Sequence, residues 1–474
     1  MGKTAVFIGM TSIQKYIFAS NKLKENIGAS YKVKDIFDKL RNKFDCSYIG
    51  GGNALIYFNS LENAEDAMKD WSRTLLQSAP GIIPNITIDD KFDDSNYSES
   101  RAKLIRKAKM QENRSIPQTE LSSLGITTDC PRSGLSAEIW GYKPKNEEGY
   151  ISSINYTKIL ASEESKAELE KDFSSVINDF EFTDEIDKLG GSVGENNHIA
   201  IVHIDGNDLG EKFKEEADEK GVQAFSTKLK EAVKNAFGQT LEKLILLKEE
   251  EEISFTEKYL PVRPIVIGGD DVTFVCDARV GMFLTVEFIK AFEEQGICKD
   301  KNITACAGIS IVKTKYPFYR AYKMAEALCG NAKRERKLRK KEDSSFIDFH
   351  ISFGGLGGSI EEIRDTDYRS ADNKILYMRP YSIDDISNLL RCLTSLSELP
   401  QSNIKKLREV LYVGEAATTG FIKELKYRDK ILPCFSNSDE SETGFSNNKS
   451  PYMDMIELID FYPKTLLNLK REGI

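Results

Sequence analysis

The sequence predicts an α+β protein with two ferredoxin-like palm domains in tandem, forming a pseudo-dimer, followed by a C-terminal α-helical bundle. Three observations predict this class: two β-α-β-β-α-β series of strand and helix patterns, a glycine-rich hairpin inside each series, and helical periodicity alone near the C-terminus. The predicted domains are a first, degenerate palm at 1–95, a connector at 96–194, a second palm at 195–365 and the helical domain at 366–474.

The first palm is predicted from a regular alternation of apolar strands and amphipathic helices. Its elements are, in order, a strand at 5–9, helical periodicity from Ser12 to Leu23, a strand, glycine turn and strand at 48–58, a helix at 62–76 and a strand at 82–88. The turn contains Gly50, Gly51 and Gly52, and glycines in such turns readily take positive φ.

The second palm repeats the same order. Its elements are a strand from His198 that ends in an acidic turn before Gly210, a hairpin at 264–275, a helix at 280–294, a strand at 303–312, a helix at 316–333 and a short strand at 346–351. The hairpin reads PIVIGGDDVTFV, which places Asp270 and Asp271 directly after a glycine pair. The sequence therefore predicts two carboxylates at the tip of a tight hairpin.

The two palms align with each other residue by residue. Laid over the second hairpin, the first hairpin has Gly52 and Asn53 in place of the two acids, and the first strand has Gly9 in place of Asp205. Glycine-rich hairpins often look alike, but here the order and spacing of the elements agree as well as the letters. We infer that the first copy has kept the fold and lost the carboxylates.

The other segments have different patterns. The connector begins with a basic, helix-prone stretch, Arg101 to Arg114, followed by an irregular segment around Cys130. In the C-terminal domain, Ser382 and Ser402 are predicted to cap two amphipathic helices. The polar stretch at 435–448 is predicted to be a mobile loop.

Composition excludes several classes of protein. The 474 residues are 40% hydrophobic and 30% charged, and no apolar run approaches the roughly 20 residues that cross a bilayer, so we expect a cytoplasmic protein without membrane contact. The eight cysteines contain no C-x-x-C pair, and each of the three histidines is followed by Ile, which excludes a zinc ribbon and a His-Asp nuclease motif. The net charge of −9 argues against strong independent DNA binding.

The paired acids predict a metal site for phosphoryl transfer. Adjacent carboxylates resist joint ionisation unless a cation lies between them, and Mg²⁺ prefers a few hard oxygen ligands. Asp205, at a strand end, is predicted to meet Asp270 and Asp271 at one edge of the sheet, and Ile204 is predicted as a further metal ligand. These residues would hold Mg²⁺ or Mn²⁺, with ATP as substrate. The alternative is that Asp and Gly are simply good turn residues.

Two further residues have open interpretations. Asp208 is an auxiliary metal ligand or ribose contact, or else merely an acid in the first turn of a helix. Lys333 opens a run to Lys341 with seven positive charges and one negative, which contacts phosphate or forms a solvated face.

Several motifs resemble one known family. Residues 7–18, 21–23 and 27–30 resemble the first palm of the large polymerase-like subunit of type III CRISPR effector complexes. The segments that resemble its second palm are 203–210, 268–271, 325–326, 332–333 and 345–350, and the sequence at 379–382, followed by helices, is similar to its C-terminal domain.

The resemblance implies a nucleotidyltransferase that joins ATP, or other nucleoside triphosphates, into cyclic oligoadenylate messengers in antiviral defence. Each palm would bind one nucleotide, and only the second would hold metal. The implied catalytic residues and metal ligands are Asp205, Asp270 and Asp271; the expected nucleotide contacts are Gly206, Asn207, Asp208, Gly268, Gly269 and Lys333, with Gly50, Gly51 and Gly52 at the acceptor nucleotide. Implied partners are other effector subunits and guide and target RNA.

The chain departs from the family pattern in two ways. The His-Asp nuclease domain is missing, and where the family often carries a four-cysteine zinc module only Cys130 is kept, so we expect a trimmed or stand-alone member. Two alternatives remain open: a non-catalytic nucleotide-binding scaffold in an RNA-guided complex, and a mononucleotide or dinucleotide cyclase outside CRISPR.

Overall fold

The computed structural model describes residues 3–114, 128–140, 149–189, 197–216, 218–248, 255, 258–297, 303–354, 358–463 and 466. They form two compact units, the first from Met1–Ser175, Asp208–Lys234 and Ile265–Asp270, and the second from Val176–Asn207, Asn235–Pro264 and Asp271–Ile474. Each unit is made of three separate segments of the chain, whereas the sequence predicted four domains that are each one continuous range. The boundaries of those four domains stay a prediction. Within the described residues, no helix has the length and apolarity that a membrane span requires.

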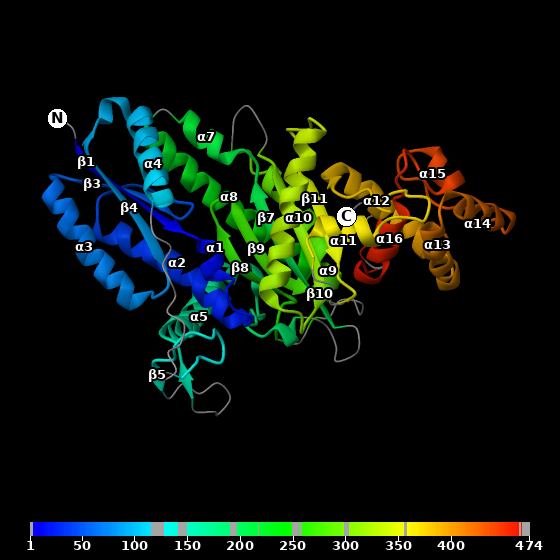
Figure 1. The fold of residues 1–474 in the computed structure, drawn as a ribbon, viewed down its shortest axis with the longest axis horizontal. Helices are drawn as coiled ribbons and strands as arrows, with labels where there is room; N and C mark the ends of the chain where they lie inside the picture. The colour runs from blue at the N-terminus through cyan, green and yellow to red at the C-terminus, as the bar shows by residue number, and fades with distance from the viewer. Residues whose placement is uncertain are drawn as a thin grey trace. The chain divides into compact units, whose positions relative to one another are not determined.

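The first unit contains a four-stranded antiparallel sheet (Figure 1). Its strands are β1 (Lys3–Thr11), β2 (Cys46–Gly50), β3 (Asn53–Phe58) and β4 (Ile83–Phe92), and its helices are α1 (Ile13–Ile17), α2 (Leu23–Lys43), α3 (Leu61–Ser78), α4 (Tyr97–Arg114) and α5 (Ser153–Asp172). The spatial order β2-β3-β1-β4 is that of a ferredoxin-like fold. The predicted α+β class is therefore confirmed for this half of the chain.

Both faces of this sheet are buried. On one face, Ala5 and Leu55 form a core cluster with Leu104 of α4 and Val222 of α8 (Glu219–Ile245). The alternating residues Val6, Ile8 and Ile56 point the other way and are also fully buried, which explains why the strands read as nearly continuous apolar runs. The predicted helical segment from Ser12 to Leu23 contains only the short helix α1, which ends at Ile17, and the long helix α2 begins where the prediction ended, at Leu23.

Helices α2 and α5 approach each other closely at Gly28. A Cβ atom at this position would lie 1.6 Å from the carbonyl oxygen of Lys158, so only glycine fits there. Beside this crossing, the fully buried Glu25 accepts a hydrogen bond from Asn155 of α5 at 2.7 Å and forms an ion pair with Arg132. The connector, which also contains β5 (Ile139–Trp140) and β6 (Tyr150–Ile151), is thereby fixed to α2.

The second sheet has six strands in the order β12-β11-β10-β7-β9-β8. They are β7 (His198–Gly206), β8 (Val262–Gly268), β9 (Asp271–Asp277), β10 (Ala305–Lys313), β11 (Phe346–Ile351) and β12 (Tyr381–Ser382). The order β8-β9-β7-β10 within it repeats that of the first sheet, which confirms the second ferredoxin-like palm. Strand β11 adds to β10 in parallel, and β12 pairs with β11.

Helices cover both faces of the second sheet. On one face, Phe237 of α8 (Glu219–Ile245) packs on Phe274 of β9 and on Phe288 of α9 (Ala278–Glu293). On the other face, helix α10 (Phe318–Leu338) packs so closely that a Cβ at Gly308 would lie 2.0 Å from the α10 backbone. Because residues two apart in a strand share a face, α10 covers the face that carries His203 and Asp205.

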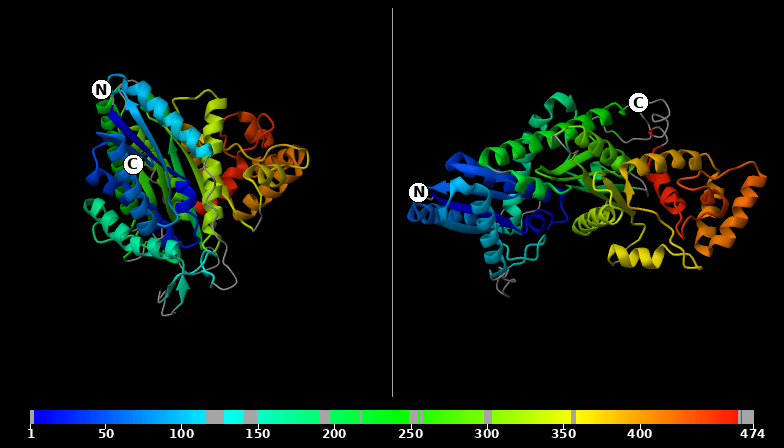
Figure 2. Two further views of the ribbon diagram at one scale, coloured as in Figure 1. Left: turned by 60° about the vertical axis from the view of Figure 1, so that its left-hand side comes forward. Right: turned by 90° about the horizontal axis from the view of Figure 1, so that it is seen from above.

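The C-terminal part of the second unit is helical, as predicted, and Figure 2 shows helices α12 to α16 (orange to red) gathered together. The remaining helices of the second unit are α11 (Ile360–Asp367), α12 (Ile383–Ser397), α13 (Gln401–Val413), α14 (Glu415–Tyr427), α15 (Ser438–Thr443) and α16 (Tyr452–Leu458). Helix α7 (Leu209–Glu215) belongs to the first unit, and α6 (Ser174–Ile177) lies where one unit passes into the other.

The structure tests three local expectations in this part. The cap at Ser382 is confirmed, because its hydroxyl accepts a hydrogen bond from the backbone of Asp385. The cap at Ser402 is wrong: α13 begins at Gln401 with Pro400 in the cap position, so Ser402 lies inside the helix. The predicted loop at 435–448 contains helix α15, because the buried Glu440 accepts hydrogen bonds from backbone groups of its own segment.

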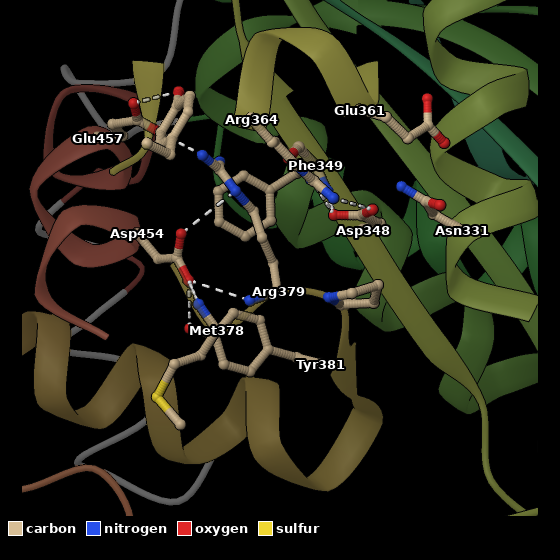
Figure 3. Close-up of polar contacts among 12 residues, drawn as sticks. Asn331, Asp348, Phe349, Glu361, Arg364, Met378, Arg379, Tyr381, Asp454 and Glu457 are labelled. Atoms are coloured by element: carbon tan, nitrogen blue, oxygen red, sulfur yellow. Dashed lines mark hydrogen bonds and ion pairs between the residues drawn. The ribbon is translucent and has the colours of Figure 1, made fainter. Parts of the chain in front are cut away.

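A buried ion network joins the C-terminal helices to the palm (Figure 3). The guanidinium of Arg379 lies 3.2 Å from Asp454 and 2.9 Å from Glu457, both on α16, and it is fully buried. Close by, Arg364 of α11 donates two hydrogen bonds to Asp348 of β11. Removing one partner would leave an uncompensated buried charge, so the network fixes α16 against the strand that extends the palm sheet.

Candidate active site

Asp205 and Asp271 lie side by side on the face of the second sheet that α10 covers. They are direct cross-strand partners, since β7 and β9 pair antiparallel with Asp205 opposite Asp271. With His203 they form a group whose ligand atoms all lie within 4.8 Å of one another, the one such group of three or more metal-type ligands in the described part of the chain. Both carboxylates are half-buried.

The end of β7 is held rigidly next to these acids. The backbone N–H of Asn207 donates to the carbonyl of Thr304 at 2.8 Å, and its side-chain amide donates to the Thr304 hydroxyl at 3.0 Å. Gly206 continues the pairing with β10, opposite Ala305. Asn207 is buried and acts as an anchor of the strand end, whereas Asp208 is exposed and starts α7 in a left-handed conformation, φ 57°.

Lys333 of α10 reaches Asp205 directly. Its Nζ lies 2.5 Å from Asp205 Oδ2 and 3.5 Å from the carbonyl oxygen of Gly206. Burial alone would lower the pKa of Lys333, but the carboxylate of Asp205 outweighs it and holds that pKa above its ordinary value. The ammonium group is therefore charged and compensates one of the two neighbouring carboxylates.

His203 has two contacts that fix its ring. Nδ1 lies 3.0 Å from the hydroxyl of Thr273, its cross-strand partner on β9, and the ring meets Tyr322 of α10 edge to face with centroids 5.7 Å apart. Burial lowers the pKa of His203, so the ring is neutral near pH 7. Burial raises the pKa of the Tyr322 hydroxyl, and the nearby charges of Asp205 and Asp271 raise it as well.

The glycine-aspartate hairpin has a two-residue turn. Gly268 ends β8, Gly269 has φ 63°, Asp270 is the second turn residue and Asp271 begins β9. The structure thus brings Asp271 to Asp205 and leaves Asp270 outside the group. Burial raises the pKa of the Tyr48 hydroxyl in the first unit to about 12, and the charge of Asp270 also raises it. A catalytic role of Asp270 stays a prediction.

The glycine turn of the first palm lies against the turn of the second within the first unit. A Cβ at Gly269 would come within 3.9 Å of the backbone of Gly51. Gly51 and Gly52 have φ values of 57° and 74°, which L-residues with side chains rarely adopt. Gly50, by contrast, is the last residue of β2, and a Cβ at this position would meet the ring of Tyr48.

The register of the first sheet confirms the alignment of the two palms. Gly9 on β1 is the cross-strand partner of Asn53 on β3, just as Asp205 on β7 is the partner of Asp271 on β9. A Cβ at Gly9 would approach the Asn53 side chain at 3.2 Å. The equivalent position in the first palm thus has the same backbone pairing with neutral residues in place of the carboxylates.

The arginines of the basic run after Lys333 make contacts within the protein. Helix α10 continues to Leu338, beyond the predicted end at Lys333. Arg336 is buried and donates from Nε to the carbonyl of Glu342 at 3.2 Å, and Arg339 pairs with Glu335 at 2.7 Å. Within this run, Lys333 is the residue that the structure places at the acids.

Sequence reasoning did not select His203 as a site residue. The signal was present, because His203 precedes Asp205 by two residues in a strand and must share its face. Ile204, between them, points to the opposite face and is buried, so only its carbonyl oxygen could join a metal site.

Comparison with known proteins agrees with this geometry. Residues 198–342 match the family model of the second palm domain of Cas10/Cmr2. This segment is similar to the second palm domain of Cas10/Cmr2. It contains the acids, His203 and Lys333, so the match to the family model covers the part of the chain where the candidate site lies.

Solved structures of Csm1 have the same fold over nearly the whole chain. Csm1 from T. onnurineus is 14% identical, with a TM-score of 0.58, and a Csm1–Csm4 cassette in complex with one ATP is 15% identical, with a TM-score of 0.56. A Csm1–Csm4 cassette in complex with cA4 is 14% identical, with a TM-score of 0.57. Each match covers 99% of this chain and 69% of the other. No curated protein matches the sequence.

Proposed function

We propose that this chain is a divalent-metal-dependent nucleotidyltransferase that joins ATP, or another nucleoside triphosphate, into cyclic oligonucleotides in CRISPR-type antiviral defence. The observation that carries the proposal is the pairing of Asp205 and Asp271 at one position of a Cas10-type palm. The Csm1 structures with ATP and with cA4 support the choice of nucleotide. Cytoplasmic location follows only as an expectation from this role.

The donor set fits a hard divalent cation. Two carboxylates within 4.8 Å of each other supply the oxygen ligands that Mg²⁺ or Mn²⁺ prefers, and Asp205 Oδ1 is not the oxygen that Lys333 engages. Asp205 and Asp271 would hold the ion, with the carbonyl of Ile204 as a third candidate. When bound, the ion neutralises phosphate charge and helps to activate the attacking hydroxyl.

The protein groups around the acids suit a triphosphate. The ammonium of Lys333 brings positive charge to the end of β7, and Gly268 leaves open space where a side chain would stand. The left-handed Gly269 turn lets the backbone approach a bound nucleotide. In the same way, the Gly51 turn of the first palm supplies backbone without side chain, as an acceptor nucleotide that needs orientation rather than metal would require.

One observation favours a different class of function. Asp205 is already compensated by Lys333, so the site does not need a metal ion to be electrostatically tolerable. A non-catalytic palm that binds nucleotide as part of an RNA-guided complex, with partners such as a Csm4-like subunit and guide and target RNA, would be compatible with this ion pair. A mononucleotide or dinucleotide cyclase would use the same acids and differ in product.

Product analysis distinguishes these functions. Purified protein is incubated with each nucleoside triphosphate and Mg²⁺ or Mn²⁺, and the products are resolved by mass. We expect oligonucleotide products with wild type and none with Asp271→Asn. Metal-dependent ATP binding without any product would favour the scaffold, and cyclic mononucleotides or dinucleotides would favour the other cyclase.

A further inference from the structure

His203 is a buried nitrogen donor beside the two carboxylates. Its side chain is 4% exposed, and it lies on β7 two residues before Asp205, on the face that α10 covers. One of its ring nitrogens lies within 4.8 Å of the ligand oxygens of Asp205 and Asp271. An imidazole in this place is not needed for a site that uses oxygen ligands alone.

The orientation of the ring points to the nitrogen available for a ligand. Nδ1 is engaged by the hydroxyl of Thr273 at 3.0 Å, and the edge-to-face contact with Tyr322 restricts rotation of the ring. Histidines that bind metals commonly donate the N–H of one nitrogen to a neighbouring group while the other nitrogen binds the ion. In the tautomer whose Nδ1–H donates to the Thr273 hydroxyl, the lone pair belongs to Nε2.

We propose that His203 supplies Nε2 as a ligand to the divalent cation held by Asp205 and Asp271, and that this nitrogen makes the site prefer Mn²⁺ or Co²⁺ to Mg²⁺. The inference rests on the proposed function, since it presumes that the two acids bind a cation. The physical reason is that Mg²⁺ is bound almost entirely by oxygen, whereas imidazole binds first-row transition-metal ions well.

The chain offers a matched pair of variants. His203→Phe keeps an aromatic ring of similar size against Tyr322 and removes both nitrogens. His198→Phe is the control, because His198 lies on the same strand, is buried, and meets Phe461 edge to face at 5.1 Å without belonging to the acid group. Thr273→Val removes the hydroxyl that orients the His203 ring and leaves the ring in place.

The measurements are metal affinities and a spectroscopic signature, both independent of turnover. Mn²⁺ binding is titrated by electron paramagnetic resonance, and Mg²⁺ affinity is obtained by competition. We expect His203→Phe to weaken Mn²⁺ binding at least roughly tenfold, Thr273→Val to weaken it less, and neither to change Mg²⁺ affinity by more than about twofold. Pulsed spectra of bound Mn²⁺ should show coupling to ¹⁴N in wild type and His198→Phe and none in His203→Phe.

The same titrations with Asp271→Asn separate this inference from the proposed function. If Asp271→Asn abolishes Mn²⁺ binding while His203→Phe leaves it intact, or if wild-type spectra lack ¹⁴N coupling, His203 is not a ligand and the carboxylate site stands. If Asp271→Asn leaves Mn²⁺ binding unchanged, the metal site of the proposed function is itself overturned. Equal losses of Mn²⁺ and Mg²⁺ affinity in His203→Phe would contradict the selectivity. The wild-type spectra decide the question of ligation even if a variant fails to fold.

Discussion

Replacing Lys333 by Met should weaken the fold and strengthen cation binding at the same time. The Nζ of Lys333 lies 2.5 Å from Asp205 Oδ2, and about 30% of each side chain is exposed. An ion pair at about 4 Å is worth roughly 1 kcal/mol in bulk water and about 4 kcal/mol at an effective dielectric constant of about 20. Because solvent screens this pair partly, we take about 1–2 kcal/mol as its contribution to stability.

The same charge also repels any cation that approaches Asp205. Without it, divalent-metal affinity should rise by about 1.4 kcal/mol, roughly tenfold, while the free energy of unfolding without metal falls by about 1–2 kcal/mol. Saturating metal should restore much of that loss by linkage. Turnover of ATP should nevertheless fall, since the proposed phosphate contact is missing.

Urea unfolding with and without Mn²⁺, together with metal titrations, measures these effects. Lys340→Met is the control, because Lys340 is exposed and lies after the end of α10, and it should change neither quantity. If Lys333→Met left metal affinity unchanged or weakened it, then Lys333 would not compete with the cation at Asp205. If Lys333→Met and Lys340→Met changed metal affinity equally, the basic run would act through its summed charge and Lys333 would make no specific contact with the site.

Three further predictions follow from packing, titration and the hairpin. Gly28→Ala should lower the free energy of unfolding in urea by at least about 2 kcal/mol, because the added Cβ would meet the backbone of α5. Gly420→Ala, where the helix has open space for a Cβ, should raise this free energy by about 0.5–1 kcal/mol. A Gly28→Ala protein as stable as wild type would refute the close crossing of α2 and α5. Burial and nearby arginines lower the pKa of His350 to about 3, whereas in the unfolded chain this histidine takes up its proton near pH 6.5, so the free energy of unfolding should fall as pH drops from about 6.5 towards 3. Between pH 7 and pH 4.5, His350→Phe should lose about 2 kcal/mol less of this free energy than wild type. Parallel curves of unfolding free energy against pH for the two proteins would contradict this. Asp271→Asn should abolish metal binding and Asp270→Asn should weaken it much less, because only Asp271 faces Asp205; the reverse order, in a metal titration, would show that the turn residue is the ligand.

Local patterns in the sequence were sufficient to predict the palms. Strand periodicity and the glycine hairpins predicted the element order, and the alignment of the two copies put Gly9 where Asp205 stands and Gly52 and Asn53 where the two hairpin acids stand. The registers of the two sheets then showed which of these residues pair, Gly9 with Asn53 and Asp205 with Asp271. This worked because a strand has a fixed period of two residues, so that a hairpin determines which side chains meet.

The contacts that the sequence did not predict connect distant segments. Lys333 was expected at a phosphate, but its partner in the structure is Asp205, which lies on another element. The network of Arg379 with Asp454 and Glu457 joins residues some 75 positions apart, and no local periodicity records such a pairing. The separation of Asp270 from Asp271 depends on the exact turn, in which one acid is a turn residue and the other begins a strand.

The most direct test of the central claim is to compare the nucleotide products of wild type and Asp271→Asn. Both proteins are incubated with ATP and Mn²⁺, nucleotide binding is measured in parallel, and the products are resolved by mass. We expect oligonucleotides from wild type, and no product and no metal-dependent ATP binding from Asp271→Asn, which removes one of the two paired carboxylates. Undiminished product from Asp271→Asn, or a wild-type protein that neither binds ATP in the presence of metal nor converts it, would contradict the assignment of the active site to the second palm.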